Sequence, residues 1–188
     1  MNHFKAGNTK IDKSCLISCL PTTVCFGKGK QCKGCYAKGP EVRFPTVLAS
    51  RERKLAQTKA GGFVYDAIEE IRASKKTTVR VHESGDFYSQ AYIDAYVAIA
   101  TMLPNVQFYT YTKKMKKFDF SVLANLDNFN LIDSITPIGL NFGPAEYCET
   151  LVADYGYTLC PCGVDADAKC MRDCTACATV KKVCFLKH

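Results

Sequence analysis

Twelve cysteines in 188 residues constrain this chain more than any other feature of its sequence. Seven of them form two groups near opposite ends, namely Cys25, Cys32 and Cys35 in the first and Cys160, Cys170, Cys174 and Cys177 in the second. Thiols two or three residues apart can point at one metal centre without backbone strain, so such spacings recur in zinc and iron–sulfur sites. Two separate groups therefore predict two metal centres.

Composition favours metal ligation over disulfide bonds. The first ten residues lack the apolar stretch of a signal peptide, and no run of about 20 apolar residues could cross a bilayer. We therefore expect a cytoplasmic protein with no membrane association, whose thiols stay reduced. The net charge of +7 could attract nucleic acid. A stronger explanation is that lysines near the thiolates offset the negative charge of the metal sites.

Hydrophobic patterning predicts alternating helices and strands. Helices are expected over 45–59, 63–73, 89–102 and 118–126, and strands over 77–81, 106–112, 130–135 and 138–142. This alternation is typical of βα units with a parallel sheet. An eight-stranded barrel typically needs about 250 residues, so we predict an α/β fold with a truncated, open βα barrel.

We expect a single domain, 1–188, with three parts. Residues 1–40 are poor in apolar periodicity and predict a cluster-binding loop organised by metal. Residues 41–145 form the βα core, and 146–188 form a C-terminal, Cys-rich metal segment. The Cys-rich ends are expected to cap the carboxyl edge of the strands, where α/β proteins place their sites.

The first cysteine group leaves the metal open. Three thiolates can hold a [4Fe–4S] cluster with one iron free for an outside ligand. Alternatively, a fourth thiolate from Cys15 or Cys19 could complete a zinc site.

The second group offers four thiolates, with Cys162 as a substitute for Cys160. Four thiolates form a closed shell, as in structural zinc or an auxiliary [4Fe–4S] cluster. The two isolated cysteines, Cys148 and Cys184, are expected to be buried without a metal.

The segment after the 77–81 strand is a candidate binding loop. Ser84 and Gly85 allow close approach to a ligand, and Asp86 could accept a hydrogen bond from it. The alternative is an ordinary turn that leads into the next helix. His82 could be a ligand or a base, although a core histidine is more usual on a strand.

These motifs resemble the phage gene product 88 family, a group of bacteriophage proteins related to radical S-adenosylmethionine enzymes. The likeness is carried by segments 8–10, 20–21, 79–87 and 108–113, by Cys25, Cys32 and Cys35-Tyr36-Ala37, and by Cys160-Pro161 with the closing cysteines. It implies a [4Fe–4S] cluster on Cys25, Cys32 and Cys35 and a second centre at the Cys160 group. It also implies that Ser84, Gly85 and Asp86 hold the methionyl group of S-adenosylmethionine, in the cytoplasm of the host cell.

The resulting hypothesis is an iron–sulfur protein on a radical S-adenosylmethionine-like scaffold, which would cleave S-adenosylmethionine reductively on an unknown substrate. The rival is a non-catalytic interaction protein stabilised by iron–sulfur or zinc, which meets nucleic acid or a host or phage protein. A two-cluster electron carrier is a third alternative.

Overall fold

The computed structural model describes residues 2–25, 35–165 and 167–186. Its main sheet has five strands in the order β1-β2-β3-β4-β5. These are β1 (Phe4–Ala6), β2 (Cys15–Ser18), β3 (Thr78–Val81), β4 (Gln107–Thr112) and β5 (Phe129–Asp133). Strands β2 to β5 run parallel, and β1 pairs antiparallel with β2 at the edge.

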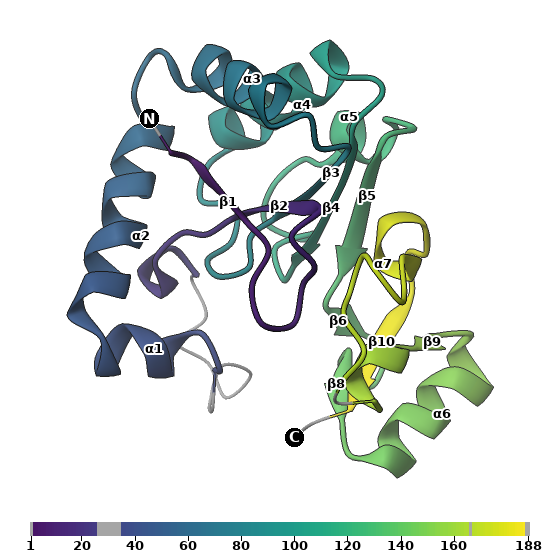
Figure 1. Ribbon diagram of the computed structural model, residues 1–188. Coiled ribbons are helices and arrows are strands. Elements are labelled where there is room, and N and C mark those ends of the chain that lie inside the picture. The colour runs from purple at the N-terminus through teal and green to yellow at the C-terminus, as the bar shows by residue number, and fades with distance from the viewer. Residues whose placement is uncertain (1, 26–34, 166, 187–188) are drawn as a thin grey trace.

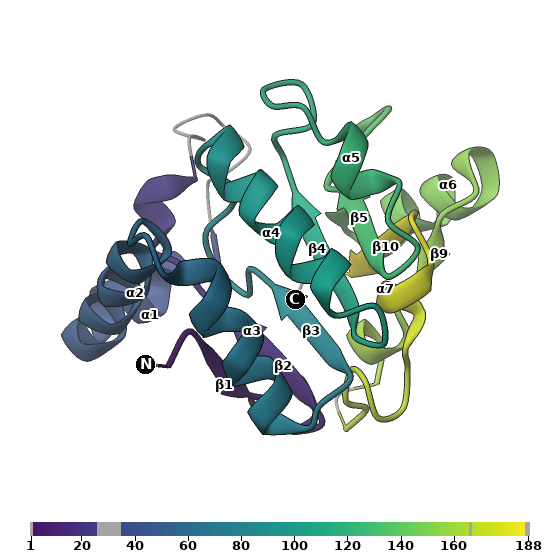
Figure 2. The same ribbon diagram turned by 90° about the horizontal axis from the view of Figure 1, so that it is seen from above.

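Three helices cover one face of this sheet (Figures 1 and 2). They are α3 (Phe63–Ser74), α4 (Gln90–Met102) and α5 (Ser121–Ala124). Their apolar stripes bury the side chains that β3, β4 and β5 direct to that side, such as Val79, Phe108 and Phe129. The predicted α/β class with a parallel sheet is thus confirmed, while the described residues form an open sheet that does not close into a barrel.

The amino-terminal part differs from the prediction. Residues 1–40 were expected to be loop, yet they supply β1 and β2, the short helix η1 (Thr22–Val24) and the start of α1 (Lys38–Arg43). The strands have only three and four residues, too few for a periodic signal. They are stabilised by pairing, since β2 joins β3 and β1 joins β2. Helix α2 (Pro45–Thr58) stands beside the β1 edge of the sheet (Figure 1).

The carboxyl-terminal part covers the other face of the sheet near β4 and β5. It contains β6 (Ile135–Thr136), β7 (Gly139–Leu140), β8 (Phe142–Gly143), α6 (Ala145–Tyr155), β9 (Thr158–Leu159), η3 (Pro161–Gly163), α7 (Ala176–Thr179) and β10 (Val183–Leu186). Strand β10 lies between β8 and β9 in a second small sheet. The strand predicted over 138–142 is therefore split between two different sheets.

Polar side chains fix this segment on the sheet. Gln107, at the start of β4, donates to the carbonyl of Ala178, and Asn130 of β5 donates to the carbonyls of Cys177 and Val180. The C-terminal cysteines consequently lie over the sheet face instead of capping its carboxyl edge as expected, because the amides that bind them belong to the beginnings of β4 and β5.

Candidate metal centre

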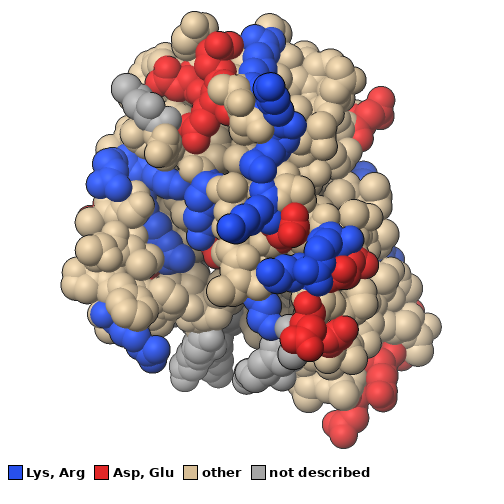
Figure 3. Space-filling model, in the orientation of Figure 1, with Lys and Arg blue, Asp and Glu red and all other residues tan. Residues whose placement is uncertain are grey.

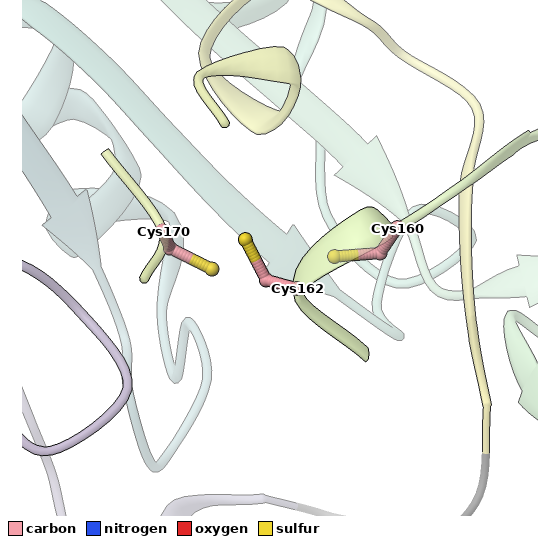
Figure 4. Close-up of side chains that lie close together, drawn as sticks. All are labelled: Cys160, Cys162 and Cys170. Atoms are coloured by element: carbon pink, nitrogen blue, oxygen red, sulfur yellow. The ribbon is translucent and has the colours of Figure 1, made fainter. Parts of the chain in front are cut away.

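Three thiols of the C-terminal segment converge on one point. The sulfur atoms of Cys160, Cys162 and Cys170 all lie within 4.8 Å of one another, and Figure 4 shows them turned toward a shared space. Cys160 and Cys162 are buried and Cys170 is half-buried. Such a group can hold a metal ion.

Local backbone structure brings these thiols together from distant parts of the segment. The amide of Cys160 donates to the carbonyl of Cys184 in β10, and Pro161 begins the 3-10 helix η3 that turns Cys162 inward. Cys170 pairs with Ile11 in an isolated bridge, where its amide donates to the carbonyl of Lys10. The site therefore depends on the chain just before β2 as well as on the C-terminal segment.

The predicted ligand set is only partly assembled at this point. Cys160 and Cys170 belong to the converging group, but the third member is Cys162, which the sequence offered only as a substitute. Cys174 forms a backbone bridge with Cys170, and Cys177 packs in the same apolar cluster as Cys160. Among the described residues, the thiols that lie within 4.8 Å of one another do not include those of Cys174 and Cys177.

The thiols influence each other strongly. Hydrogen bonding from the Cys160 thiol lowers the pKa of Cys170 to about 6, against the effect of burial and with help from Cys162 and Arg80. The same bond raises the pKa of Cys160, which remains protonated. Burial, followed by the charge of Cys170, raises the pKa of Cys162 to about 12. Without metal, the protonated thiols of Cys160 and Cys162 both bond to the thiolate of Cys170. A bound cation would stabilise all three residues as thiolates by offsetting the repulsion between their negative charges.

Buried donors lie on the sheet beneath these thiols. The Nε of Arg80 has no hydrogen-bond partner among the described residues. The hydroxyls of Tyr109 and Tyr111 face the thiols of Cys15 and Cys177, where burial raises the pKa of each thiol and the hydroxyl lowers it. Arg80 pairs with Tyr109 across β3 and β4, and its guanidinium lies 5.5 Å from the ring centre of Tyr111. Donors facing a thiolate site match the negative charge that its sulfurs carry when a metal is bound, so the residues fit a metal–thiolate group.

Sequence reasoning gave no role in the site to Arg80, Tyr109 or Tyr111. Alternation along 79–81 could have identified Arg80, because Val79 and Val81 face the helices and Arg80 must face the other side.

Cys15 lies near the C-terminal thiols. It is fully buried in β2, in the apolar cluster that contains Cys160, Cys162 and Cys177, and burial raises its pKa to about 11. Cys19, in contrast, is 3.9 Å from the Nζ of Lys54 in α2. Cys148 and Cys184 are buried in a separate apolar cluster with Leu151, as their isolation in the sequence predicts.

The first cysteine group is only partly described. Cys32 lies outside the described residues, and Cys25 and Cys35 are half-buried on either side of that gap. Lys114, just after β4, donates to the carbonyl of Val24, and the hydroxyl of Tyr36 donates to the carbonyl of Glu83. These bonds hold both ends of the segment at the carboxyl edge of β3 and β4.

The candidate loop 84–86 is tied to the same edge. The hydroxyl of Ser84 donates to the carbonyl of Leu20, and the Asp86 carboxylate accepts from the hydroxyl of Thr112 and the amide of Lys113. Gly85 has φ +82°, and a Cβ there would lie 2.6 Å from the Cβ of Leu20. The Ser84 and Asp86 side chains are thus engaged within the fold, while Gly85 allows the chain before Cys25 to pass closely.

His82 is a buried core histidine. Its Nε2 is 3.3 Å from the hydroxyl of Tyr92, and its ring packs edge-on against Phe87. Burial, with a smaller contribution from the charge of Lys114, lowers the pKa of His82 to about 3. His82 is therefore a core histidine, which is the more usual of the roles that the sequence suggested for it.

This burial predicts a pH-dependent stability. The unfolded chain binds a proton at His82 near its ordinary pKa of about 6.5, but the folded chain does not, so the contribution is complete above that pH and declines below it. We expect the free energy of unfolding to fall by about 2 kcal/mol from this residue alone between pH 7 and pH 5. Urea titrations at several pH values give the free energy of unfolding of the wild type and of His82→Asn, since asparagine tolerates the positive φ of 66°. The wild type should lose more of this free energy between pH 7 and pH 5 than the variant. An equal loss in both proteins would contradict the assignment of a buried, neutral His82.

Among the described residues, no helix is long and apolar enough to cross a membrane. Searches of curated proteins and of solved structures find no match to this chain. A family model described as Gene product 88 matches residues 3–141, which include Cys25, Cys32 and Cys35 and the 82–87 loop but end before the C-terminal thiols. Since the match covers well over half of the sequence, the chain belongs to the Gene product 88 family.

Proposed function

We propose that this chain is a metal-dependent protein whose C-terminal thiols hold one structural ion, with zinc as the metal. The observation that carries the proposal is the convergence of Cys160, Cys162 and Cys170 within 4.8 Å. A zinc–sulfur bond of about 2.3 Å in a tetrahedral site separates the sulfurs by about 3.8 Å. A [4Fe–4S] cluster places each thiolate on a different iron and spreads them farther apart, so one ion suits this spacing better. Cys174 or Cys177 supplies the fourth thiolate.

The role of this ion is to fasten the C-terminal segment to the sheet. Its ligands come from the end of β9, from η3 and from the stretch that pairs with Ile11. Cross-linking these three places holds the cover over Ile17, Tyr109 and Ile132, which are buried on that face. Arg80 and the two tyrosines beside it orient and neutralise the thiolates.

We further propose that Cys25, Cys32 and Cys35 bind a [4Fe–4S] cluster, in the reducing cytoplasm of a host cell. Those residues would hold such a cluster with one iron open, and after reduction by an external one-electron donor it would supply the electron for reductive cleavage of S-adenosylmethionine, the start of radical chemistry on a substrate. Support comes from the bonds that fix Val24 and Tyr36 beside the 84–86 loop, at the edge where parallel sheets bind ligands. Since Ser84 and Asp86 already bond within the protein, the backbone at Gly85 is the part of this loop that would meet the methionyl group.

The same engagement of Ser84 and Asp86 favours a second candidate. If the loop is only a structural junction, the chain is a non-catalytic protein that metal stabilises and that binds a host or phage macromolecule.

Separate removal of the two centres tests these proposals. After anaerobic reconstitution with iron and sulfide, we expect Cys35→Ala to lose the brown iron chromophore and keep zinc. Cys162→Ala should lose zinc and keep the iron chromophore. Elemental analysis measures both metals, and electron paramagnetic resonance of the reduced protein detects the iron–sulfur cluster. Wild-type protein that takes up no iron and sulfide would refute the cluster.

The enzyme proposal needs one further measurement. Reduced, cluster-loaded wild-type protein should convert S-adenosylmethionine to 5′-deoxyadenosine, and Cys35→Ala should not. A fully loaded cluster that yields no 5′-deoxyadenosine would leave the non-catalytic candidate.

A further inference from the structure

A groove opens between the β1 edge of the sheet and helix α2. Its volume is about 680 Å³, and neither Cys25, Cys35 nor the C-terminal thiols are among the described residues that line it. Figure 3 shows Lys and Arg side chains spread across this half of the molecule, where β1 and α2 lie. The lining residues are Asn2, Phe4, Lys5, Cys19, Thr46, Val47, Ser50, Arg51, Arg53, Lys54 and Gln57.

The face of α2 that borders the groove is polar and basic. Three- and four-residue steps relate these lining residues to one another, as in 47–51, 50–54 and 54–57, so they share one side of the helix: Val47, Ser50, Arg51, Lys54 and Gln57. A helix beside a sheet normally turns apolar residues inward. In α2, however, Arg51 and Lys54 are the buried residues. Burying two cations is costly unless an anion compensates them.

The protein compensates only some of these charges. Arg51 pairs with Glu41 at 2.8 Å, and Lys5 pairs with Glu83. Lys54 is 9% exposed, and its Nζ donates a long hydrogen bond of 3.9 Å to the sulfur of Cys19, which is not a carboxylate. No carboxylate is among the described residues that line the groove. Lys54 and the exposed Arg53 therefore leave positive charge facing the groove.

Neutral polar groups surround this charge. Thr46 and Ser50 supply hydroxyls and Asn2 an amide, while the Oε1 of Gln57 is buried without a hydrogen-bond partner in the described part of the chain. An acceptor of this kind suits an amino or hydroxyl group on the same ligand that brings the negative charge.

We propose that this groove binds the phosphate groups of a nucleotide, either free or as part of a single-stranded nucleic acid. Lys54 and Arg53 contact the phosphate oxygens, Thr46 and Ser50 add hydrogen bonds, and Gln57 accepts from the sugar or base. The proposal is independent of either metal centre.

Fluorescence anisotropy with two probes tests the proposal on metal-loaded full-length protein at low salt. One probe is a fluorescent ATP analogue, and the other is a fluorescein-labelled oligothymidylate. We expect Lys54→Met and Arg53→Gln each to weaken binding about tenfold or more. The matched control is the double variant Lys75→Gln/Lys116→Gln, which removes two exposed lysines outside the groove and should bind like the wild type.

The two probes distinguish the sources of phosphate. Binding of the ATP analogue, with or without the oligothymidylate, identifies a nucleotide site, and binding of the oligothymidylate alone, with a steep salt dependence, identifies a nucleic-acid site. The Arg53→Gln variant changes an exposed side chain, so it remains informative if Lys54→Met folds poorly. Binding of neither probe, or equal losses in the control variant, would overturn the proposal.

Discussion

Replacing Cys170 with alanine is expected to release the C-terminal metal and to lower the free energy of unfolding by at least about 4 kcal/mol. Cys170 joins the C-terminal segment to the chain before β2, since its amide and carbonyl bond to Lys10 and Asp12. Without the ion, buried thiols at Cys160 and Cys162 lose their common partner, and the cover over Ile17 loosens. Chemical denaturation with parallel zinc analysis measures both effects, and a chelator should reproduce them in the wild type.

Cys148→Ala is the matched control for this prediction. It removes a more deeply buried sulfur from a separate apolar cluster, so it should cost only about 1–2 kcal/mol and leave the zinc content unchanged. Cys174→Ala and Cys177→Ala identify the fourth ligand, because only the ligand variant should lose zinc. A wild-type protein that is purified without bound metal and is insensitive to a chelator would contradict the proposed structural ion.

The central part of the fold could be predicted because each of its elements carries a local pattern. The strand predicted over 106–112 appears as β4 (Gln107–Thr112), and the helix predicted over 89–102 appears as α4 (Gln90–Met102). Alternation along β4 places Phe108 against the helices and Tyr109 against the C-terminal segment. Apolar periodicity shows which side of a helix or strand is buried. In these central elements, burial of that side against the core determines the secondary structure.

The strands near the ends could not be predicted in the same way. β2 (Cys15–Ser18) is buried at all four positions, so it shows no alternation, and its pairing with β3 joins residues more than 60 positions apart. Partners at such separation are not visible in a local window. The small strands β8, β9 and β10 depend on the same kind of distant pairing.

The sequence predicted that cysteines form the candidate site, but not which of the cysteines come together there. Cysteine spacing predicted a metal site in the C-terminal segment, where three thiols converge, yet it ranked Cys162 below Cys174 and Cys177. Spacing describes only which thiols are neighbours along the chain, whereas η3 and the Ile11 bridge decide which ones meet. The contribution of β2 could not be foreseen either, because Cys15 precedes the first cysteine group in sequence but lies with the second in space.

The second large effect is expected from Gly85→Ala, which should lower the free energy of unfolding by about 3 kcal/mol or more. Two costs combine at this position. A φ of +82° is unfavourable for alanine, and the new Cβ would lie 2.6 Å from the Cβ of Leu20, which has no flexible end to move aside. Relief requires separation of the Leu20 backbone from the loop, which breaks the hydrogen bond between the amide of Leu20 and the carbonyl of Ser84.

Gly156→Ala separates these two costs. Gly156 has a similar φ of +67°, but nothing lies within 4 Å of a Cβ built there, so its replacement should cost only about 1–2 kcal/mol. Urea denaturation measures the loss in free energy of unfolding for each variant, and the difference between the two losses is the steric cost at Gly85. Equal losses would show that Leu20 moves away from the new Cβ at no cost. Because Leu20 leads directly into Cys25, a real steric cost should also displace the first cysteine group. Gly85→Ala should then take up less iron than Gly156→Ala at equal zinc content, which links the close packing of this loop to the proposed cluster.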